Sequence, residues 1–411
     1  MKETFSQRKV LVIGSGFFAL TLIWTFYNAY MPLILANHIE RTSIIGAIMG
    51  LDNLLAVLLI PLIGAWSDQM NTRFGKRLPF LMVGMPLAAL FFVLLPFMQS
   101  TLWTLLFIDI LFLLAMTLYR APVISLMPDH TAPERRSLAN GYINLMGGIG
   151  AIVALFGLSQ LYQVNSTYPF IVASILLMSA FLLLFRSVDR HPPYTTNTNN
   201  EQEEVQARRS VTRGLAELFL KKHRGQAFIL FAIFVYFIGY ASIEALFTLY
   251  ATRTLGFTEG LAGLTLGFFS LSFVLFAVPA GWIGQKLGKV ETMVIGLILL
   301  PLFFVAIPFI STPLLLQVFL FLAGVAWALI NVQAYPLVAD LGGLAKIGLF
   351  TGLYYLFSMS AQLIGPTLLG LMMDFFGGAA LFFSASATFV VAYFLLQHGK
   401  KKIEQTKPIA A

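Results

Sequence analysis

The sequence has no cysteine and few charged residues. Without cysteine there can be no disulfide, no thiol nucleophile and no cysteine-ligated zinc or iron–sulfur site. Only 11% of the 411 residues are charged, whereas an ordinary soluble domain carries about 25%. The five histidines lie in loops or at the ends of apolar segments, which leaves no buried imidazole for a metal site or a proton relay. These shortages argue against a soluble protein, a metal site and redox chemistry.

Two further absences concern catalysis and energy supply. No nucleophile and base can be paired in the sequence, so an enzyme is not expected. The phosphate-binding pattern G-x-x-x-x-G-K-[ST] does not occur, which argues against ATP as the driving force. We therefore expect no cofactor and no metal.

Long apolar segments dominate the rest of the sequence, in which 58% of the residues are hydrophobic. Each segment is long enough to cross a hydrocarbon core about 30 Å thick as a helix. Twelve helices are expected, over 10–36, 43–67, 79–98, 101–126, 137–163, 167–186, 226–252, 259–284, 290–310, 313–338, 346–373 and 377–397. The sequence thus predicts an all-α polytopic membrane protein with twelve transmembrane helices.

The net charge of +8 comes from basic residues on one side of the membrane. When the loops are numbered alternately, only Arg41 and Arg253 lie on the side opposite the termini. Basic loops stay in the cytoplasm, so we expect both termini to be cytoplasmic and the protein to be a multi-pass protein of the cell (inner) membrane. The positive charge therefore indicates membrane topology and no nucleic-acid partner.

A polar stretch in the middle of the chain, 191–213, indicates a linker. We expect an N-terminal six-helix bundle over 1–186, a cytoplasmic linker over 187–225, and a C-terminal six-helix bundle with a short cytoplasmic tail over 226–411. Apolar residues at helical spacing near 211–219 allow an interfacial helix in the linker. A solvated basic segment is the alternative.

The two halves of the sequence repeat each other. Three glycines of the second span recur in the eighth at an offset of 217 residues: Gly46, Gly50 and Gly64 correspond to Gly263, Gly267 and Gly281. The stretch LYRAPVISLMPD (118–129) aligns with LINVQAYPLVAD (329–340) at an offset of 211. Such parallel repeats are typical of carriers with a substrate site between two pseudo-symmetric bundles near the middle of the membrane.

A family resemblance rests on three stretches. The run GAWSDQMNTRFGKRLPF (64–80) resembles the loop between spans two and three of the major facilitator transporters, and its R-x-G-[KR]-R-x-P-F form resembles the plant-type sucrose/proton symporters and their animal and bacterial relatives. Asp109 and Arg120 stand 11 residues apart, as do a carboxylate and an arginine of those symporters, and 352–366 resembles their span eleven. The resemblance implies a major facilitator fold.

The same resemblance implies a gate at the cytoplasmic end. Asp68 would lie against the start of span eleven near 345–348, where free N–H groups favour an anion. The basic residues of the loop would anchor it to lipid headgroups or to neighbouring acids. The gating residues are expected to be Asp68, Arg73, Gly75, Lys76, Arg77 and Asp129.

Three carboxyl groups inside the expected spans are candidates for cation coupling. Asp52, Asp109 and Glu244 lie at similar depth on spans two, four and seven, where a charge costs about 2.5–3.5 kcal/mol or more. Burial and mutual repulsion favour the neutral acid, so one of them could bind and release a proton near neutral pH. The melibiose-type cation symporters are also similar, and there Asp52 with Asn53 would supply oxygen ligands for sodium.

Polar and aromatic side chains at helical spacing are candidates for binding a solute. Asn331 occupies the repeat position of Arg120, and we expect Arg120 to exchange partners, with Asp129 as one of them. For each lone Asn or Gln, a hydrogen bond between helices is the alternative. The candidates are Trp24, Tyr27, Asn28, Arg120, Asn144, Tyr240, Asn331, Tyr355 and Gln362.

These features predict a secondary active transporter that carries a sugar or related small polar solute with a proton, by alternating access. Its partners would be the solute, the coupling cation and the lipid bilayer. Three alternatives stay open: a sodium-coupled sugar symporter, an exporter of amphipathic compounds, and a membrane receptor or scaffold. The oligomeric state does not follow from the sequence.

Overall fold

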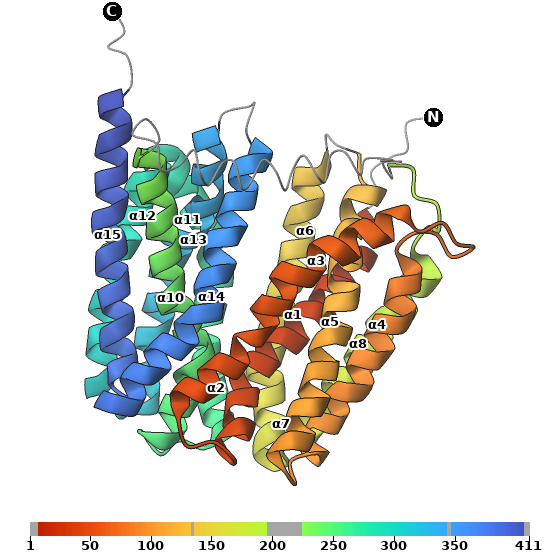
Figure 1. Cartoon of the computed structure of the whole chain (residues 1–411), viewed down its shortest axis with the longest axis horizontal. Helices are drawn as coiled ribbons and strands as arrows, with labels where there is room; N and C mark the ends of the chain where they lie inside the picture. The colour runs from red at the N-terminus through yellow and green to blue at the C-terminus, as the bar shows by residue number, and fades with distance from the viewer. Residues whose placement is uncertain (1–6, 133–134, 195–223, 343–346, 407–411) are drawn as a thin grey trace, which may run out of the picture. The chain divides into compact units, whose positions relative to one another are not determined.

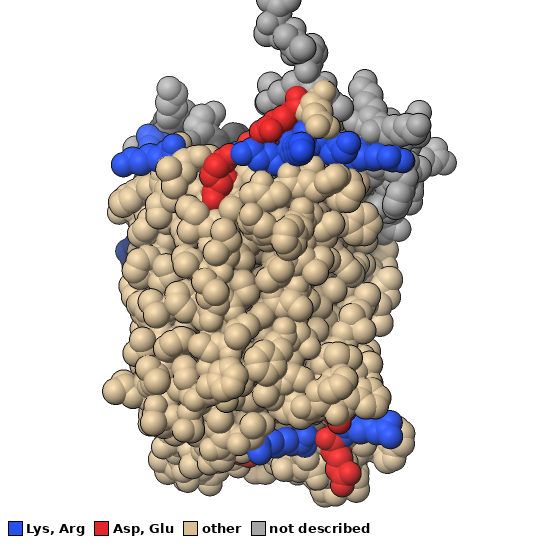
Figure 2. All heavy atoms as spheres, turned by 90° about the vertical axis from the view of Figure 1, so that its left-hand side faces the viewer, with Lys and Arg blue, Asp and Glu red and all other residues tan. Residues whose placement is uncertain are grey.

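The computed structural model describes residues 7–132, 135–194, 224–342 and 347–406. In this part of the chain, twelve helices are long and apolar enough to cross a membrane. Figure 2 shows one face of the molecule on which the charged side chains gather at the two ends and leave a broad uncharged band between them. The predicted all-α, twelve-helix membrane fold is confirmed.

The described residues form two compact units. Unit 1 contains residues 1–40, 54–199 and 257–267, and unit 2 contains 41–53, 200–256 and 268–411. The helices of unit 1 are α1 (Gln7–Ala36), most of α3 (Leu51–Gln69), α4 (Leu78–Leu94), η1 (Leu95–Phe97), α5 (Leu102–His130), α6 (Arg136–Ile152), η3 (Val153–Leu158), α7 (Ser159–Val164) and α8 (Tyr168–Ser187). Those of unit 2 are α2 (Thr42–Met49), α10 (Arg224–Arg253), most of α11 (Glu259–Leu287), α12 (Lys289–Ala306), η5 (Ile307–Phe309), α13 (Pro313–Gly342), α14 (Ile347–Phe376) and α15 (Ala380–Thr406).

The helices pack in the same order in both units. In unit 1, α1 packs on α6 and α8, and α4 packs on α5 and α8. In unit 2, α10 packs on α14 and α15, as Figure 1 shows, and α12 packs on α13 and α15. A 3-10 turn with proline at its second position ends both α4 (Leu95–Phe97) and α12 (Ile307–Phe309). The internal repeat seen in the sequence is therefore also a repeat of packing.

The second and fifth spans are not regular α-helices throughout. Span two (Thr42–Gln69) has an irregularity at Gly50, between α2 and α3, where the backbone keeps helical angles of φ −74° and ψ −15°. Span five contains the π-helical segment η3, between α6 and α7. Hydropathy alone cannot reveal either irregularity, because the apolar run continues through both.

Each unit contains a short segment that is joined at both ends to chain of the other unit. Residues 41–53 belong to unit 2, and residues 257–267 belong to unit 1. These segments carry repeated glycines, at which the helices approach closely. A Cβ atom at Gly46 would collide with the carbonyl of Pro366 on α14, and one at Gly263 would collide with the Tyr30 hydroxyl. Glycine is required there because two backbones, or a backbone and a ring, are in direct contact.

Candidate functional site

A buried carboxyl group lies in the middle of unit 1. Asp109 on α5 is 1% exposed, and the Tyr27 hydroxyl on α1 donates a hydrogen bond of 2.9 Å to its Oδ1. The rings of Phe112 and Trp24 pack against Tyr27 at 5.2 and 5.7 Å between centroids. The rings hold Tyr27 in place, and the tyrosine hydroxyl fixes the orientation of the buried carboxyl group.

Arg120 contacts the same aromatic group. Among the described residues of unit 1, it is the arginine that lies inside a span and away from the helix ends. The Arg120 guanidinium carbon lies 5.7 Å from the centroid of the Trp24 ring, a distance at which a cation is attracted by the π-face. The Trp24 Nε1 atom is buried and has no hydrogen-bond partner among the described residues. Trp24 thus joins the Asp109–Tyr27 pair to Arg120 and has one donor left for a further group.

An aromatic cluster of unit 2 surrounds the Tyr240 position. Its ring stacks on Trp327 of α13 at 4.0 Å and 3°, and Glu244 lies one turn further along α10. The Tyr236 ring contacts Trp327 edge-on at 5.7 Å, and its buried hydroxyl has no hydrogen-bond partner among the described residues. Trp327 is 2% exposed, so it holds Tyr240 in place.

Of the three coupling candidates, Asp109 lies in unit 1 and the other two lie in unit 2. Asp52 follows the irregularity at Gly50, and its Oδ1 accepts hydrogen bonds of 2.6 Å from both the backbone and the side chain of Asn53. Glu244 lies one turn from Tyr240 on α10. Each carboxyl group thus has its own local neighbours.

The remaining predicted ligands lie on four different helices. Asn144 on α6 and Tyr355 on α14 are exposed, while Asn28, Asn331 and Gln362 are partly buried. Gln362 donates a weak hydrogen bond of 3.3 Å to the Ser358 carbonyl. These positions stay predictions.

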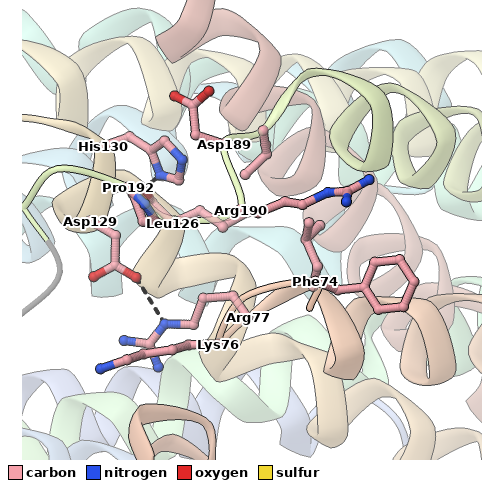
Figure 3. Close-up of a pocket in the computed structure, with 11 residues that line it drawn as sticks. Phe74, Lys76, Arg77, Leu126, Asp129, His130, Asp189, Arg190 and Pro192 are labelled. Carbon is pink, nitrogen blue, oxygen red and sulfur yellow. Dashed lines mark hydrogen bonds and ion pairs between the residues drawn. The ribbon is translucent and has the colours of Figure 1, made fainter. Parts of the chain in front are cut away.

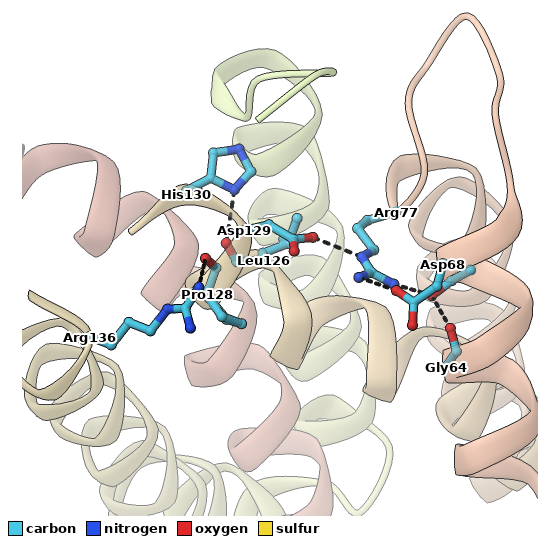
Figure 4. Close-up of polar contacts among 9 residues, drawn as sticks. Gly64, Asp68, Arg77, Leu126, Pro128, Asp129, His130 and Arg136 are labelled. Atoms are coloured by element: carbon cyan, nitrogen blue, oxygen red, sulfur yellow. Dashed lines mark hydrogen bonds and ion pairs between the residues drawn. The ribbon is translucent and has the colours of Figure 1, made fainter. Parts of the chain in front are cut away.

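A cluster of charged side chains lies where α3, α4 and α5 meet at the end of unit 1 that holds the start of α1. The Arg77 guanidinium binds Asp68, the hydroxyl of Ser67 and, at 2.9 Å from Nε, Asp129 Oδ2 (Figure 4). The side chains of Arg77 and Asp129 are each 9% exposed. Ser67 in turn donates to the Gly64 carbonyl at 2.9 Å. We call Ser67, Asp68, Arg77 and Asp129 the Arg77 cluster.

The loop before Arg77 is a tight turn. Thr72 caps it with its hydroxyl, which donates to the Gly75 carbonyl at 2.8 Å. Gly75 has φ +82°, and a Cβ atom there would collide with the Arg190 carbonyl, so glycine is required on both counts. The Phe74 ring has the guanidinium carbons of Arg73 and Arg190 at 4.8 and 5.4 Å. The turn therefore presents Arg77 to the two carboxylates.

The chain that follows α8 covers this loop. Asp189 pairs with Lys9 at 2.9 Å, and the Tyr194 N–H donates to the Asp129 carbonyl at 3.2 Å. A small pocket between this segment and the loop is lined by Lys76, Arg77, Asp129, His130, Asp189 and Arg190, among others (Figure 3). The predicted gating residues thus lie close together in sequence and space, with Arg77 and Asp129 buried, Asp68 and Lys76 partly exposed and Arg73 exposed.

Unit 2 has only part of this cluster. Lys289, 212 residues after Arg77, binds Asp340, which is 211 residues after Asp129. The position of Asp68 is taken by Gln285, which is exposed. Asp340 is 65% exposed, so the pair is largely solvated. In unit 1, by contrast, the buried Arg77 guanidinium has three partners, Ser67, Asp68 and Asp129.

Asp68 and Asp129 bind a different partner from the ones expected. The predicted partner of Asp68 at 345–348 lies partly outside the described residues, and in this structure Asp68 binds Arg77. Asp129, expected as one partner of Arg120, also binds Arg77. The interfacial helix expected near 211–219 lies outside the described residues.

Sequence reasoning missed three residues of these sites. Ser67 and Trp327 are buried members of the clusters, and Asp374 at the end of α14 accepts hydrogen bonds from α2. Lys289 stands 212 residues after Arg77, which neither repeat offset, 217 or 211, predicts. For Trp327 the sequence offers no signal beyond an aromatic residue one turn before Asn331.

Among the described residues, no three His, Asp or Glu side chains gather closely enough to hold a metal ion.

The comparison with known proteins begins with a family model. The model of the Major Facilitator Superfamily matches residues 13–261 and 229–410. The isoprimeverose transporter of Lactiplantibacillus pentosus is 25% identical over 304 residues, which are 69% of this chain and 60% of that protein. The tetracycline resistance protein, class B, of Escherichia coli is 24% identical over 352 residues, 84% of this chain and 83% of that protein.

A shorter match and two solved structures complete the comparison. Human proton-associated sugar transporter A is 32% identical over 78 residues, 19% of this chain and 10% of that protein. A bacterial homolog of the human lysosomal transporter Spinster aligns with a TM-score of 0.75 at 14% identity, covering 99% of this chain and 100% of that chain. The nucleoside transporter NupG aligns with a TM-score of 0.74 at 15% identity, covering 96% and 100%. These structures share the fold, and the chain spans less than two thirds of the two sugar-transporter relatives.

Proposed function

Because this chain belongs to the Major Facilitator Superfamily, we propose that it carries a sugar or a related small polar solute across the cell membrane together with a proton. The family and the relatives are transporters and not enzymes, and the molecule is an integral, multi-pass membrane protein. Its partner is a small-molecule solute. The proton, the solute class and the cell membrane are the parts that we propose.

The observation that carries the proton is the Asp109–Tyr27 pair. Taking an ionised carboxylate out of water costs several kcal/mol, whereas the neutral acid is hydrogen-bonded at little cost. A 1% exposed carboxyl group inside a span is therefore suited to carry a proton. Tyr27 can donate to the carboxylate at 2.9 Å, or accept once the acid is protonated, because a phenolic hydroxyl does both.

The proposed solute class is supported by aromatic and polar groups within each unit and by two relatives. In unit 1, Arg120 lies beside the aromatic ring of Trp24. In unit 2, Tyr240 and Trp327 form a stacked aromatic pair. Aromatic faces with a few polar groups suit a small polar solute. Sugar transport is what the names of the isoprimeverose transporter and of proton-associated sugar transporter A describe.

We also propose that both termini are cytoplasmic, because the basic residues follow the positive-inside rule. In this orientation the Arg77 cluster lies at the cytoplasmic end of unit 1, and α2 begins at the outer end of unit 2.

The test is uptake of a panel of labelled sugars into proteoliposomes with an imposed pH gradient. For Asp109→Asn we expect gradient-driven accumulation to fall at least roughly tenfold, because an amide cannot carry the proton, while exchange of solute across the membrane continues. Asp340→Asn is the matched control, since it makes the same change at a largely exposed carboxylate. Uphill uptake that persists in Asp109→Asn would remove this residue from the coupling mechanism.

Sodium coupling is tested in the same vesicles. If uptake follows a sodium gradient and is insensitive to pH, the proton proposal fails. Loss of the sodium response in Asp52→Asn would then assign the cation to Asp52 and Asn53.

A second candidate function is export of amphipathic compounds. It is favoured by the match to the tetracycline resistance protein, which covers 84% of this chain. Expression in a drug-sensitive strain would raise the tolerated concentration of such compounds if export is the function, and would leave it unchanged if sugar uptake is.

A further inference from the structure

The helix α2 has an unusual position in the chain. Residues 41–53 belong to unit 2, although the chain on both sides, up to residue 40 and from residue 54, belongs to unit 1. α2 packs on α14 and α10, which also belong to unit 2.

The N-terminus of α2 is capped by a carboxylate that is distant in the sequence. The preceding residue, Arg41, provides no side-chain cap. Instead, the two carboxylate oxygens of Asp374 on α14 accept hydrogen bonds from the Thr42 N–H at 2.6 Å, the Ser43 N–H at 3.0 Å and the Ser43 hydroxyl at 2.6 Å. The first N–H groups of a helix have no partner within the helix, and a negative charge there is stabilising. Asp374 satisfies two of these groups.

Glycines bring the two helices into backbone contact. A Cβ atom at Gly46 or Gly50 would collide with the carbonyl of Pro366 or of Leu363. In the opposite direction, a Cβ atom at Gly370 would lie 2.8 Å from the Thr42 carbonyl. The close approach along α2 positions its first turn at Asp374.

The corresponding segment in unit 1 is held differently. Residues 257–267 contact Tyr30 and Ser159 through Gly263, and Phe156 of η3 through Gly267. The first turn of that segment is capped by its own Thr258, whose hydroxyl accepts a hydrogen bond of 3.4 Å from the Leu261 N–H. The first turn of α2 is capped by a carboxylate from another helix, so the two segments differ in how they are capped.

From these contacts we infer that Asp374 is a positioning residue that fastens α2 to α14 within unit 2, and that releasing this cap frees the first turn of α2 from α14. The irregularity at Gly50 lies between α2 and α3, so α2 can leave α14 by a change of angle at this residue. Asp374 thus controls how often α2 leaves α14.

The test uses the absence of cysteine in the natural sequence. A single cysteine is introduced as Ile45→Cys, at a position on α2 that is 0% exposed, and its rate of reaction with a maleimide is measured in the full-length protein in proteoliposomes. A second reporter, Leu297→Cys on α12, is 1% exposed and reacts only when unit 2 unfolds. The ratio of the two rates distinguishes release of α2 from general unfolding.

For Asp374→Asn we expect the labelling rate at Ile45→Cys to rise roughly tenfold, because charge-assisted hydrogen bonds become neutral ones and one oxygen becomes a donor facing other donors. Labelling at Leu297→Cys should not change. Asp374→Glu, which restores the charge, should bring the rate part of the way back. Asp340→Asn is the matched control for loss of a carboxylate elsewhere in unit 2 and should change neither rate.

Two results would overturn the inference. An unchanged rate at Ile45→Cys in Asp374→Asn would mean that the cap does not hold α2. Equal acceleration at both reporters would mean that Asp374 only stabilises unit 2 as a whole. If Asp374→Asn is not recovered from membranes, Ser43→Ala removes one of the three hydrogen bonds and is judged by the same two rates. This test needs no solute, so it does not depend on the proposed function.

Discussion

Arg120 and Trp24 form the contact that most directly connects a single side chain to the proposed activity. A guanidinium is planar and can lie over an indole ring, whereas a lysine ammonium is a compact, strongly hydrated charge on a flexible stem. The guanidinium carbon lies 5.7 Å from the ring centroid. The planar shape of the arginine head group, and not only its charge, is therefore expected to matter for this contact.

We expect Arg120→Lys to reduce solute uptake roughly tenfold and Arg120→Gln to reduce it further, because the first loses the planar contact and the second also loses the charge. Uptake is measured in proteoliposomes at equal protein content. The amount of each variant in the membrane is the control for expression. Full uptake in Arg120→Lys would leave Arg120 as an anchor for the end of its helix.

The sequence could identify most single residues but not their partners. Asp109 and Arg120 stand out because charges inside a span are rare, and both prove to lie beside aromatic rings of α1. That Asp109 would bind Tyr27 and that Arg120 would contact Trp24 depends on how α1 packs on α5, which no spacing within one helix specifies.

The loop between α3 and α4 and its counterpart in unit 2 show how one element can diverge between two repeats. The buried Arg77–Asp129 pair corresponds to the solvated Lys289–Asp340 pair. When one partner of a buried ion pair is removed, the other charge stays buried without compensation. At an exposed pair, water solvates the remaining charge. The same substitution should therefore have unequal effects at the two repeat positions.

We predict that Asp129→Asn lowers the free energy of unfolding by about 3 kcal/mol, because Arg77 stays buried with its charge less compensated. Asp340→Asn should lower it by less than about 1 kcal/mol. Thermal unfolding of the purified protein in detergent, followed by tryptophan fluorescence, measures both. Equal shifts in the two variants would contradict the assignment of Arg77 and Asp129 to a buried network.

At the level of elements, the sequence predicts all twelve spans because each is an apolar run long enough for the bilayer. Hydropathy is less able to predict where each helix ends, because the last turns of a helix can be polar. The last helix was expected over 377–397, and α15 ends at Thr406, because its final turns are charged and hydropathy does not include them. The irregularity at Gly50 and the π-helical segment η3 depend on tertiary contacts and leave no mark on hydropathy.

The molecule as a whole consists of two units with the same order of helix packing. The repeat of glycines and of 118–129 in 329–340 was enough to predict this duplication from the sequence. The sequence did not indicate that residues 41–53 and 257–267 would be exchanged between the units. Hydropathy and repeats describe the order of segments along the chain, but they do not tell which unit a segment packs against.

The exchange has a consequence for a molecule cut in two. If the chain is divided between residues 199 and 200, where the assignment to units changes, each fragment lacks a segment that its own unit needs and carries one that the other fragment needs. Each fragment made alone should therefore be poorly folded. Produced together, they should recombine into one particle that copurifies through a tag on one fragment.

Gly46→Val in the first fragment should weaken this recombination strongly, since a side chain there would collide with the Pro366 carbonyl of the second fragment. Gly64→Val is the matched control, because a Cβ atom at Gly64 meets nothing within 4 Å. Recovery of both fragments at equal yield in the two variants would contradict the exchange. The reciprocal segments thus predict that the two halves of the chain behave as complementary fragments and that neither half folds completely by itself.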